Sequence, residues 1–421
     1  MSTILEQMRF APEKAALTDL MERFGLEPIL SNFEQSGGLS SMRDVVLGSD
    51  LKLSPTLSPR LFSLLDEVRT ALDYHDPADI FVAADALINA VSIHSLEEAP
   101  HIIVLTSGML ERVADAELRF ILGHEIGHIY FNHYRTRLLP HAVGKDDNGD
   151  PKMPGLLRRK LDVWNRLAEL SADRAGFAAA KGNLEPIVSV FFKITSGLGP
   201  EHLRFDIEAF LLQLDELKQL EGRELICGFS HPVTPIRVRA LQLFGQAGGV
   251  NASPRQLEKL DGEVSDLAKL MDYAPSKPLE RQARDFLIAG GLLLGNTDQL
   301  GFTEDERNML VEMLLPITAD PEGAIAEVTS VAGAREMLTK SAGWLRENAG
   351  EERFTVFRYL AMIVTVDGSL NAGEESLLIE IAEMLSIPAN AARKEMREIL
   401  ARSLQAHRSE NAKMPGMHLP S

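Results

Sequence analysis

The sequence has little of three things on which many proteins depend: cysteine, an excess of basic residues and long apolar runs. Its 421 residues include one cysteine, Cys227, so an internal disulfide is excluded. With 43 Lys and Arg against 61 Asp and Glu, the net charge is −18. This balance argues against a nucleic-acid or anionic-membrane surface, because both require clustered cations.

A membrane-spanning helix is not expected either. Such a helix needs about 20 apolar residues, and the apolar run at 286–297 is shorter. The N-terminus has no basic segment followed by an apolar core, so no signal peptide is predicted. The composition, 45% hydrophobic and 25% charged, is typical of a globular protein. We therefore expect a cytoplasmic chain without a transmembrane segment.

Hydrophobic periodicity predicts an α+β fold that is mostly helical. The residues at 102–106 (IIVLT) form the clearest strand, and 115–137 and 156–180 show the apolar spacing of two long helices. Pro232 and Pro235 open a further helix that reaches about residue 244.

The length predicts two or three domains. The Gly- and Pro-containing stretch at 245–254 is the best linker signal. In chain order we expect a helical segment at 1–40, a main domain at 41–248, a linker at 249–280, an acidic all-helical domain at 281–405 and a flexible tail at 406–421.

The clearest indication of chemistry is an HExxH motif, His124-Glu125-Ile126-Gly127-His128, inside the first long helix. Positions i and i+4 share a helix face, so the imidazoles of His124 and His128 can bind one metal ion. Zinc lowers the pKa of a bound water toward about 7. Glu125 can take the proton of that water without itself binding the metal. The motif therefore predicts a zinc site.

A catalytic zinc site needs a third protein ligand and one open position. Glu169 and Asp173 lie four residues apart in the second long helix and so share a face. We expect Glu169 to bind the zinc and Asp173 to hydrogen-bond a ligating histidine and fix its tautomer. The alternative is a solvated acidic face that pairs with Arg166 or Arg174.

His231 and Arg237, in the segment HPVTPIR, are further candidates. Either could stabilise the oxyanion of a tetrahedral intermediate. His231 could instead occupy the open zinc position and hold an enzyme inactive, or it could be an ordinary histidine at a helix start. The sequence assigns no role to His94, His101 or His133.

Together, HEIGH at 124–128, ELSAD at 169–173 and SHPVTPIR at 230–237 resemble the gluzincin metallopeptidases that include the HtpX heat-shock protease and the CAAX prenyl protease. The resemblance covers roughly 40–245 and includes an Asn-Ala at 89–90. It implies a zincin-type catalytic domain with a small β-sheet. Those members carry transmembrane helices, so this chain is more similar to the soluble minimal members.

The resemblance also implies roles for individual residues. The zinc ion would be bound by His124, His128 and Glu169. Glu125 would be the catalytic base, and Asp173 would hydrogen-bond a ligand. His231 and Arg237 fall on the family's His-Pro…Arg positions.

The C-terminal part resembles the all-helical TerB-like tellurite-resistance domains. The pairs DG at 367–368 and EE at 374–375 match best, and NTD at 296–298 replaces the first Asp-Gly. Residues 281–400 hold 20 acidic and 11 basic residues, and so carry half of the net charge of −18. The resemblance implies a divalent metal at the acidic residues. An acidic helical module for protein contacts is the alternative.

The sequence therefore predicts a zinc metalloendopeptidase that cleaves protein or peptide substrates, with Glu125 as the general base, in protein quality control or stress response. One alternative is a latent scaffold or adaptor whose C-terminal domain binds a partner or divalent metal. Another is a stress or metal-homeostasis sensor in which the C-terminal domain gates the protease.

Overall fold

The computed structural model describes most of the chain. The described residues are 3–36, 38–95, 99–145, 149, 151–219, 231–272, 277–296 and 303–413, with only the backbone considered at 38–41 and 406–413. Cys227, Thr297, Asp298 and the end of the predicted tail lie outside them. The described residues form two compact units, one up to Asp272 and one from residue 277 onward.

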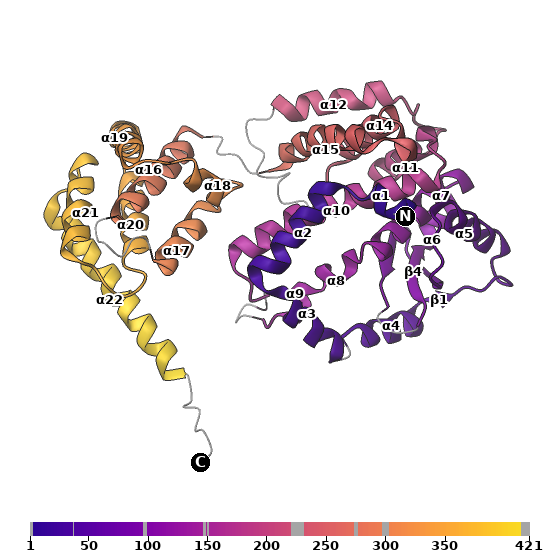
Figure 1. The fold of residues 1–421 in the computed structure, drawn as a ribbon, viewed down its shortest axis with the longest axis horizontal. Coiled ribbons are helices and arrows are strands. Elements are labelled where there is room, and N and C mark those ends of the chain that lie inside the picture. Colours follow the sequence, from indigo (N-terminus) through magenta and orange to yellow (C-terminus); the bar gives the residue numbers. More distant parts are fainter. Residues whose placement is uncertain are drawn as a thin grey trace, which may run out of the picture. The chain divides into compact units, whose positions relative to one another are not determined.

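The first unit combines a small sheet with many helices (Figure 1). Its elements up to the sheet are α1 (Ile4–Met8), α2 (Ala11–Phe24), α3 (Leu26–Gln35), α4 (Gly38–Ser49), β1 (Leu51–Lys52), α5 (Pro59–Leu72), β2 (Ala78–Ala83), β3 (Ala90–Ile93) and β4 (His101–Thr106). Those after it are α6 (Ser107–Arg112), α7 (Asp115–Tyr130), α8 (His133–Arg137), α9 (Leu139–Ala142), α10 (Gly155–Ala179), α11 (Leu184–Ser196), α12 (Ile207–Gln219), α14 (Thr234–Gln246), η1 (Gly249–Asn251), α15 (Pro254–Ala268) and η2 (Lys269–Met271).

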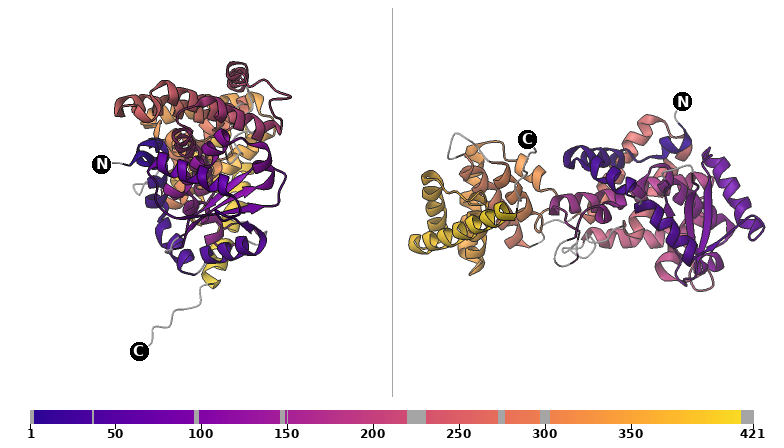
Figure 2. Two further views of the ribbon diagram at one scale, coloured as in Figure 1. Left: turned by 90° about the vertical axis from the view of Figure 1, so that its right-hand side faces the viewer. Right: turned by 90° about the horizontal axis from the view of Figure 1, so that it is seen from below.

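The four strands form one sheet (Figure 2). Their order in this mixed sheet is β1-β2-β4-β3. β2 and β4 are parallel, whereas β1 and β3 pair antiparallel with their neighbours. β4 confirms the strand predicted at 102–106. β3 is an edge strand and contacts α7.

The helix predicted at 115–137 is two helices, because the chain turns at Asn132. That residue has φ 54°, in the left-handed region that asparagine tolerates better than most residues. α7 ends at Tyr130 and α8 begins at His133, so the first side chain of α8 returns toward α7. The second long helix was predicted correctly and is α10.

The segments predicted as a separate N-terminus (1–40) and a linker (249–280) are largely part of the first unit. α15 packs against α2 and α14, and the buried Asp261 accepts hydrogen bonds from Arg174 Nη2 at 2.5 Å and the Ala11 amide at 3.1 Å. Leu5 and Phe10 are buried in the same apolar core as α7. The Gly- and Pro-rich stretch marks a turn and η1, not a unit boundary.

α7 and α10 pack at close range because small residues meet between them. A Cβ added at Gly123 would lie 2.3 Å from Cβ of Ala179, and one at Gly127 would lie 2.8 Å from Cβ of Ala175. A Cβ added at Gly176 on α10 would lie 2.7 Å from the Phe120 carbonyl oxygen. The approach brings the HExxH face of α7 against the middle of α10.

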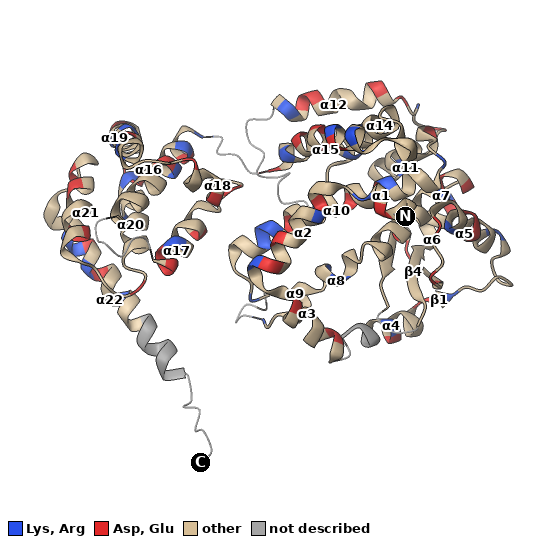
Figure 3. Cartoon of the chain, viewed as in Figure 1, with Lys and Arg blue, Asp and Glu red and all other residues tan. Residues whose placement is uncertain are grey.

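The second unit is built only of helices in the part of it that is described. They are α16 (Pro278–Leu294), α17 (Glu304–Leu314), α18 (Pro321–Ala326), α19 (Val331–Asn348), α20 (Glu352–Val364), α21 (Ala372–Met384) and α22 (Ala389–Lys413). Acidic and basic residues are interspersed along these helices rather than gathered by sign (Figure 3). Over the described chain, no helix is both long and apolar enough to cross a membrane.

The close packing generates a stability prediction. Gly123→Ala should lower the free energy of unfolding of the first unit by about 1–3 kcal/mol, because the new methyl group overlaps Ala179. The measurement is urea unfolding followed by Trp164 fluorescence in a Trp344→Phe background, which reports on the first unit alone.

Gly262→Ala on α15 is the matched control, since nothing lies within 4 Å of the added methyl group. It should stabilise the unit by up to about 1 kcal/mol. Equal stability of Gly123→Ala and the parent would show that α7 and α10 do not approach this closely.

Candidate metal centre

Three side chains from α7 and α10 converge in the interior of the first unit. Nε2 of His124 lies 3.0 Å from Nε2 of His128. Glu169 Oε2 is 3.4 Å from His124 Nε2, and Glu169 Oε1 is 3.3 Å from His128 Nε2. All three residues are buried.

This triangle has the dimensions of a metal site. Four ligands arranged tetrahedrally at zinc-type bond lengths are separated by about 3.3 Å from one another, close to the three distances above. Two imidazole nitrogens and a carboxylate are also ligands that zinc prefers. His124, His128 and Glu169 lie close enough to bind one metal ion, and no other such group of three occurs among the described residues.

Asp173 and Arg237 contact two of the three residues of the triangle, His124 and Glu169. Asp173 Oδ1 lies 3.0 Å from Nδ1 of His124, on the side of the ring away from the other ligands. Arg237 donates to both oxygens of Asp173 from Nε at 2.8 Å and Nη2 at 2.6 Å. The same Nη2 is 3.3 Å from Glu169 Oε2, and the guanidinium lies over the Phe191 ring.

Glu125 is buried beside this cluster, on the helix that packs against the edge strand β3 and its buried Ser92. Burial raises the pKa of Glu125 above its usual value, although the charge of His124 and the nearby Ser92 oppose the shift. A carboxyl group with a raised pKa accepts a proton more readily, which suits a general base.

The buried charges perturb the titration of the ligands. Burial lowers the pKa of His124, but the carboxylates of Asp173 and Glu169 outweigh it and raise that pKa to about 9. Burial and the charge of Arg137 lower the pKa of His128. The histidines and Arg237 overcome burial and hold the pKa of Glu169 well below its usual range.

His231, which precedes α14, also reaches the cluster. Its Nε2 lies 3.5 Å from Glu169 Oε1, while its side chain remains 57% exposed. All seven residues singled out in the sequence therefore come together in one place.

The sequence reasoning missed three residues around the ligands. Arg137 Nη2 donates to Glu169 Oε1 at 2.6 Å, with its side chain 32% exposed. Nδ1 of His133 lies 2.8 Å from Nδ1 of His128, and Nε2 of His133 lies 3.6 Å from Oε1 of Glu13. Nothing in the sequence distinguishes Arg137 from an arginine on the protein surface. His133 lies next to His128 only because the chain turns at Asn132, and helical periodicity does not predict that turn.

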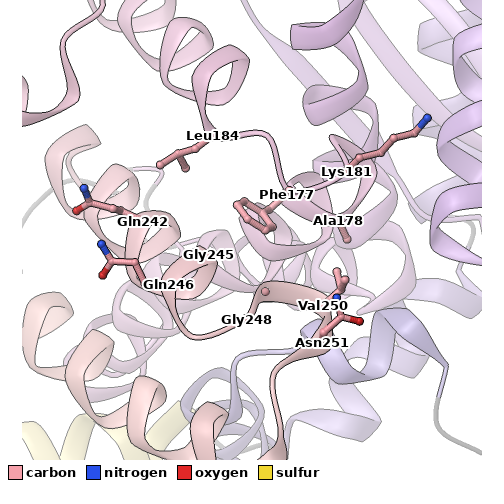
Figure 4. Close-up of a pocket in the computed structure, with 12 residues that line it drawn as sticks. Phe177, Ala178, Lys181, Leu184, Gln242, Gly245, Gln246, Gly248, Val250 and Asn251 are labelled. Atoms are coloured by element: carbon pink, nitrogen blue, oxygen red, sulfur yellow. The ribbon is translucent and has the colours of Figure 1, made fainter.

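A separate cavity of about 640 Å³ lies at the C-terminal end of α10 (Figure 4). The Phe177 ring packs against Gly245 and Gly249, and Gln242, Gln246 and Asn251 contribute amides to the lining. None of the residues of the candidate metal centre line this cavity.

In the second unit the acidic residues noted in the sequence have local partners. Asp367 accepts hydrogen bonds from the amide and hydroxyl of Ser369, and Glu374 accepts one from the Asn371 amide at the start of α21. These contacts begin a turn and a helix. The described part of the unit holds no group of three ligands for the divalent metal expected there.

Comparisons with known proteins found two matches. Residues 56–145, which include the HExxH segment but not Glu169, match the family described as Peptidase family M48. The chain is 27% identical to the "Plastoglobule-localized metallopeptidase 48, chloroplastic" of Arabidopsis thaliana over 239 residues, 54% of this chain and 67% of the relative. No solved structure matches significantly. The two matches support a metallopeptidase.

The contact between His124 and Asp173 predicts an effect on metal affinity. Asp173→Asn should weaken zinc binding about 10–100-fold, because the amide is a poorer partner for the histidine and for Arg237. Competition with a chromophoric chelator at fixed pH measures the affinity.

Asp162→Asn, about three turns earlier on α10, is the matched control and should bind zinc as the parent does. Unchanged zinc affinity in Asp173→Asn would remove Asp173 from the metal centre.

Proposed function

We propose that this chain is a zinc-dependent endopeptidase, similar to the HtpX-type gluzincins, that acts on unfolded protein segments in quality control or stress response. The observation that carries the proposal is the triangle of His124, His128 and Glu169 beside the buried Glu125. These three ligands would hold the ion, which when bound polarises the scissile carbonyl and acidifies a water molecule.

In the proposed reaction Glu125 takes a proton from the attacking water as the water oxygen bonds to the carbonyl carbon. Glu125 then gives the proton to the amide nitrogen as the C–N bond breaks. The helix α7 that carries Glu125 packs against the edge strand β3. That edge can pair with an extended substrate through main-chain hydrogen bonds.

His231 and Arg237 differ in what they can do for the oxyanion. Arg237 is only 15% exposed and donates to both oxygens of Asp173, so we propose that it orients Asp173 and Glu169. His231 is more than half exposed next to the ligand triangle. It is therefore the donor that we propose for the oxyanion.

We also propose that the second unit is a TerB-like module that binds a protein partner. The local hydrogen bonds of Asp367 and Glu374 favour protein contacts over metal binding at those residues.

Glu125→Gln should keep zinc bound but abolish cleavage of an unfolded protein, because the amide cannot accept the water proton. The measurements are zinc content and the release of peptides from a denatured substrate. Glu111→Gln, on the exposed surface of α6, is the control and should cleave normally. Cleavage by Glu125→Gln would contradict the assignment of the base.

His231→Ala should lower kcat about 100-fold with little change in KM or zinc affinity, since an oxyanion donor acts mainly in the transition state. Steady-state kinetics on a fluorogenic peptide test this. A variant that is more active than the parent would mean that His231 occupies the open metal position instead.

A further inference from the structure

We propose that Glu13, on the N-terminal helix α2, is a positioning residue of the metal centre that acts through His133 to orient His128. This inference rests on the proposed metal site, because it requires His128 to be a ligand. It assigns a role at that site to the N-terminal segment, which lies outside the residues matched at 56–145.

The first step is the set of ring tautomers. His128 presents Nε2 to His124 and Glu169, so Nε2 must be free of a proton to bind a metal, and Nδ1 must carry one. That Nδ1 lies 2.8 Å from Nδ1 of His133, which must accept the hydrogen bond. The proton of His133 is then on Nε2, which lies 3.6 Å from Glu13 Oε1.

The second step is the state of His133 itself. It is fully buried, and its Nε2 makes no hydrogen bond in the structure. A buried N–H without an acceptor is costly, and Glu13 offers a carboxylate oxygen only about 0.6 Å beyond a normal N–H···O distance. Phe131 and Trp164 lie against the imidazole, with ring centroids at 5.4 and 5.6 Å, and restrict its rotation.

The third step is the placement of Glu13, whose exposure is 0%. Arg9 donates to both of its oxygens, from Nε at 2.7 Å and Nη2 at 3.1 Å. Trp164 Nε1 donates at 3.0 Å and Ser171 Oγ at 3.3 Å. Burial raises the pKa of Glu13, but His133 and Arg9 outweigh it and lower that pKa to about 2. A carboxylate that is both charged and immobilised can hold one tautomer of a neighbouring imidazole.

The fold brings these groups together from distant parts of the chain. α2 packs along α10, which supplies Trp164 and Ser171 (Figure 1). The left-handed residue Asn132 turns His133 back onto α7. A segment needed only to cover the core would not require a buried carboxylate at this point, because an apolar side chain would pack there at lower cost.

The test compares zinc affinity in the full-length chain. Glu13→Gln should weaken zinc binding about 10–100-fold, measured by chelator competition, and should shift the visible absorption of the Co²⁺-substituted protein. His133→Leu should weaken binding similarly. If Glu13 acts through His133, the double variant should bind zinc no more weakly than His133→Leu alone.

Glu117→Gln is the matched control. Glu117 is also a buried carboxylate, it pairs with Lys193 at 2.7 Å, and it lies on the metal-bearing helix α7 but away from the ligands. It should lose stability and yet keep zinc affinity within about twofold of the parent. If Glu13→Gln does not fold, Arg9→Met, whose side chain is nearer the surface, should weaken zinc binding in the same direction.

Parent-like zinc affinity and an unchanged Co²⁺ spectrum in Glu13→Gln, or in Arg9→Met if that variant replaces it, would overturn the inference. Equal losses of affinity in Glu13→Gln and Glu117→Gln would do the same, since they would follow stability alone. Failure of the parent chain to bind zinc would instead overturn the metal site, and with it this inference.

Discussion

The structure depends on the close contact between α7 and α10. Gly123 and Gly127 on one helix face Ala175 and Ala179 on the other, so the two backbones approach where larger side chains would separate them. The contact aligns the i, i+4 pair of histidines with the carboxylates of Glu169 and Asp173, and a helix spacing only slightly larger would open the ligand triangle. The glycines of the motif region are thus as much a part of the site as the side chains that would bind metal.

A second constraint is the burial of charge. A carboxylate or guanidinium in a protein interior is tolerated only when it is paired and hydrogen-bonded. Around the ligands this is met by linked pairs, Arg237 with Asp173 and Arg9 with Glu13. Because water is largely excluded, each pair acts strongly on its neighbours. The same arrangement that stabilises the interior therefore sets the orientation of the histidine rings.

The sequence predicts the parts of this site that follow from helical periodicity. His124 and His128, and likewise Glu169 and Asp173, are four residues apart, and that spacing alone places each pair on one face. The turn at Asn132 depends on one left-handed residue, which a period of 3.6 does not reveal. Glu13 becomes significant only through contacts with α8 and α10. The structure differs from the linker predicted at 249–280 for a similar reason. The pairing of Asp261 with Arg174, which joins α15 to the first unit, is a tertiary interaction that local sequence does not reveal.

The central claim is that His124, His128 and Glu169 bind zinc in the arrangement seen here. X-ray absorption spectroscopy of the zinc-loaded chain tests it most directly. The account predicts a first shell of two imidazole nitrogens and oxygen ligands at about 2.0–2.2 Å, with no sulfur. A zinc–sulfur distance of about 2.3 Å, which would implicate Cys227, or a shell without imidazole, would contradict it.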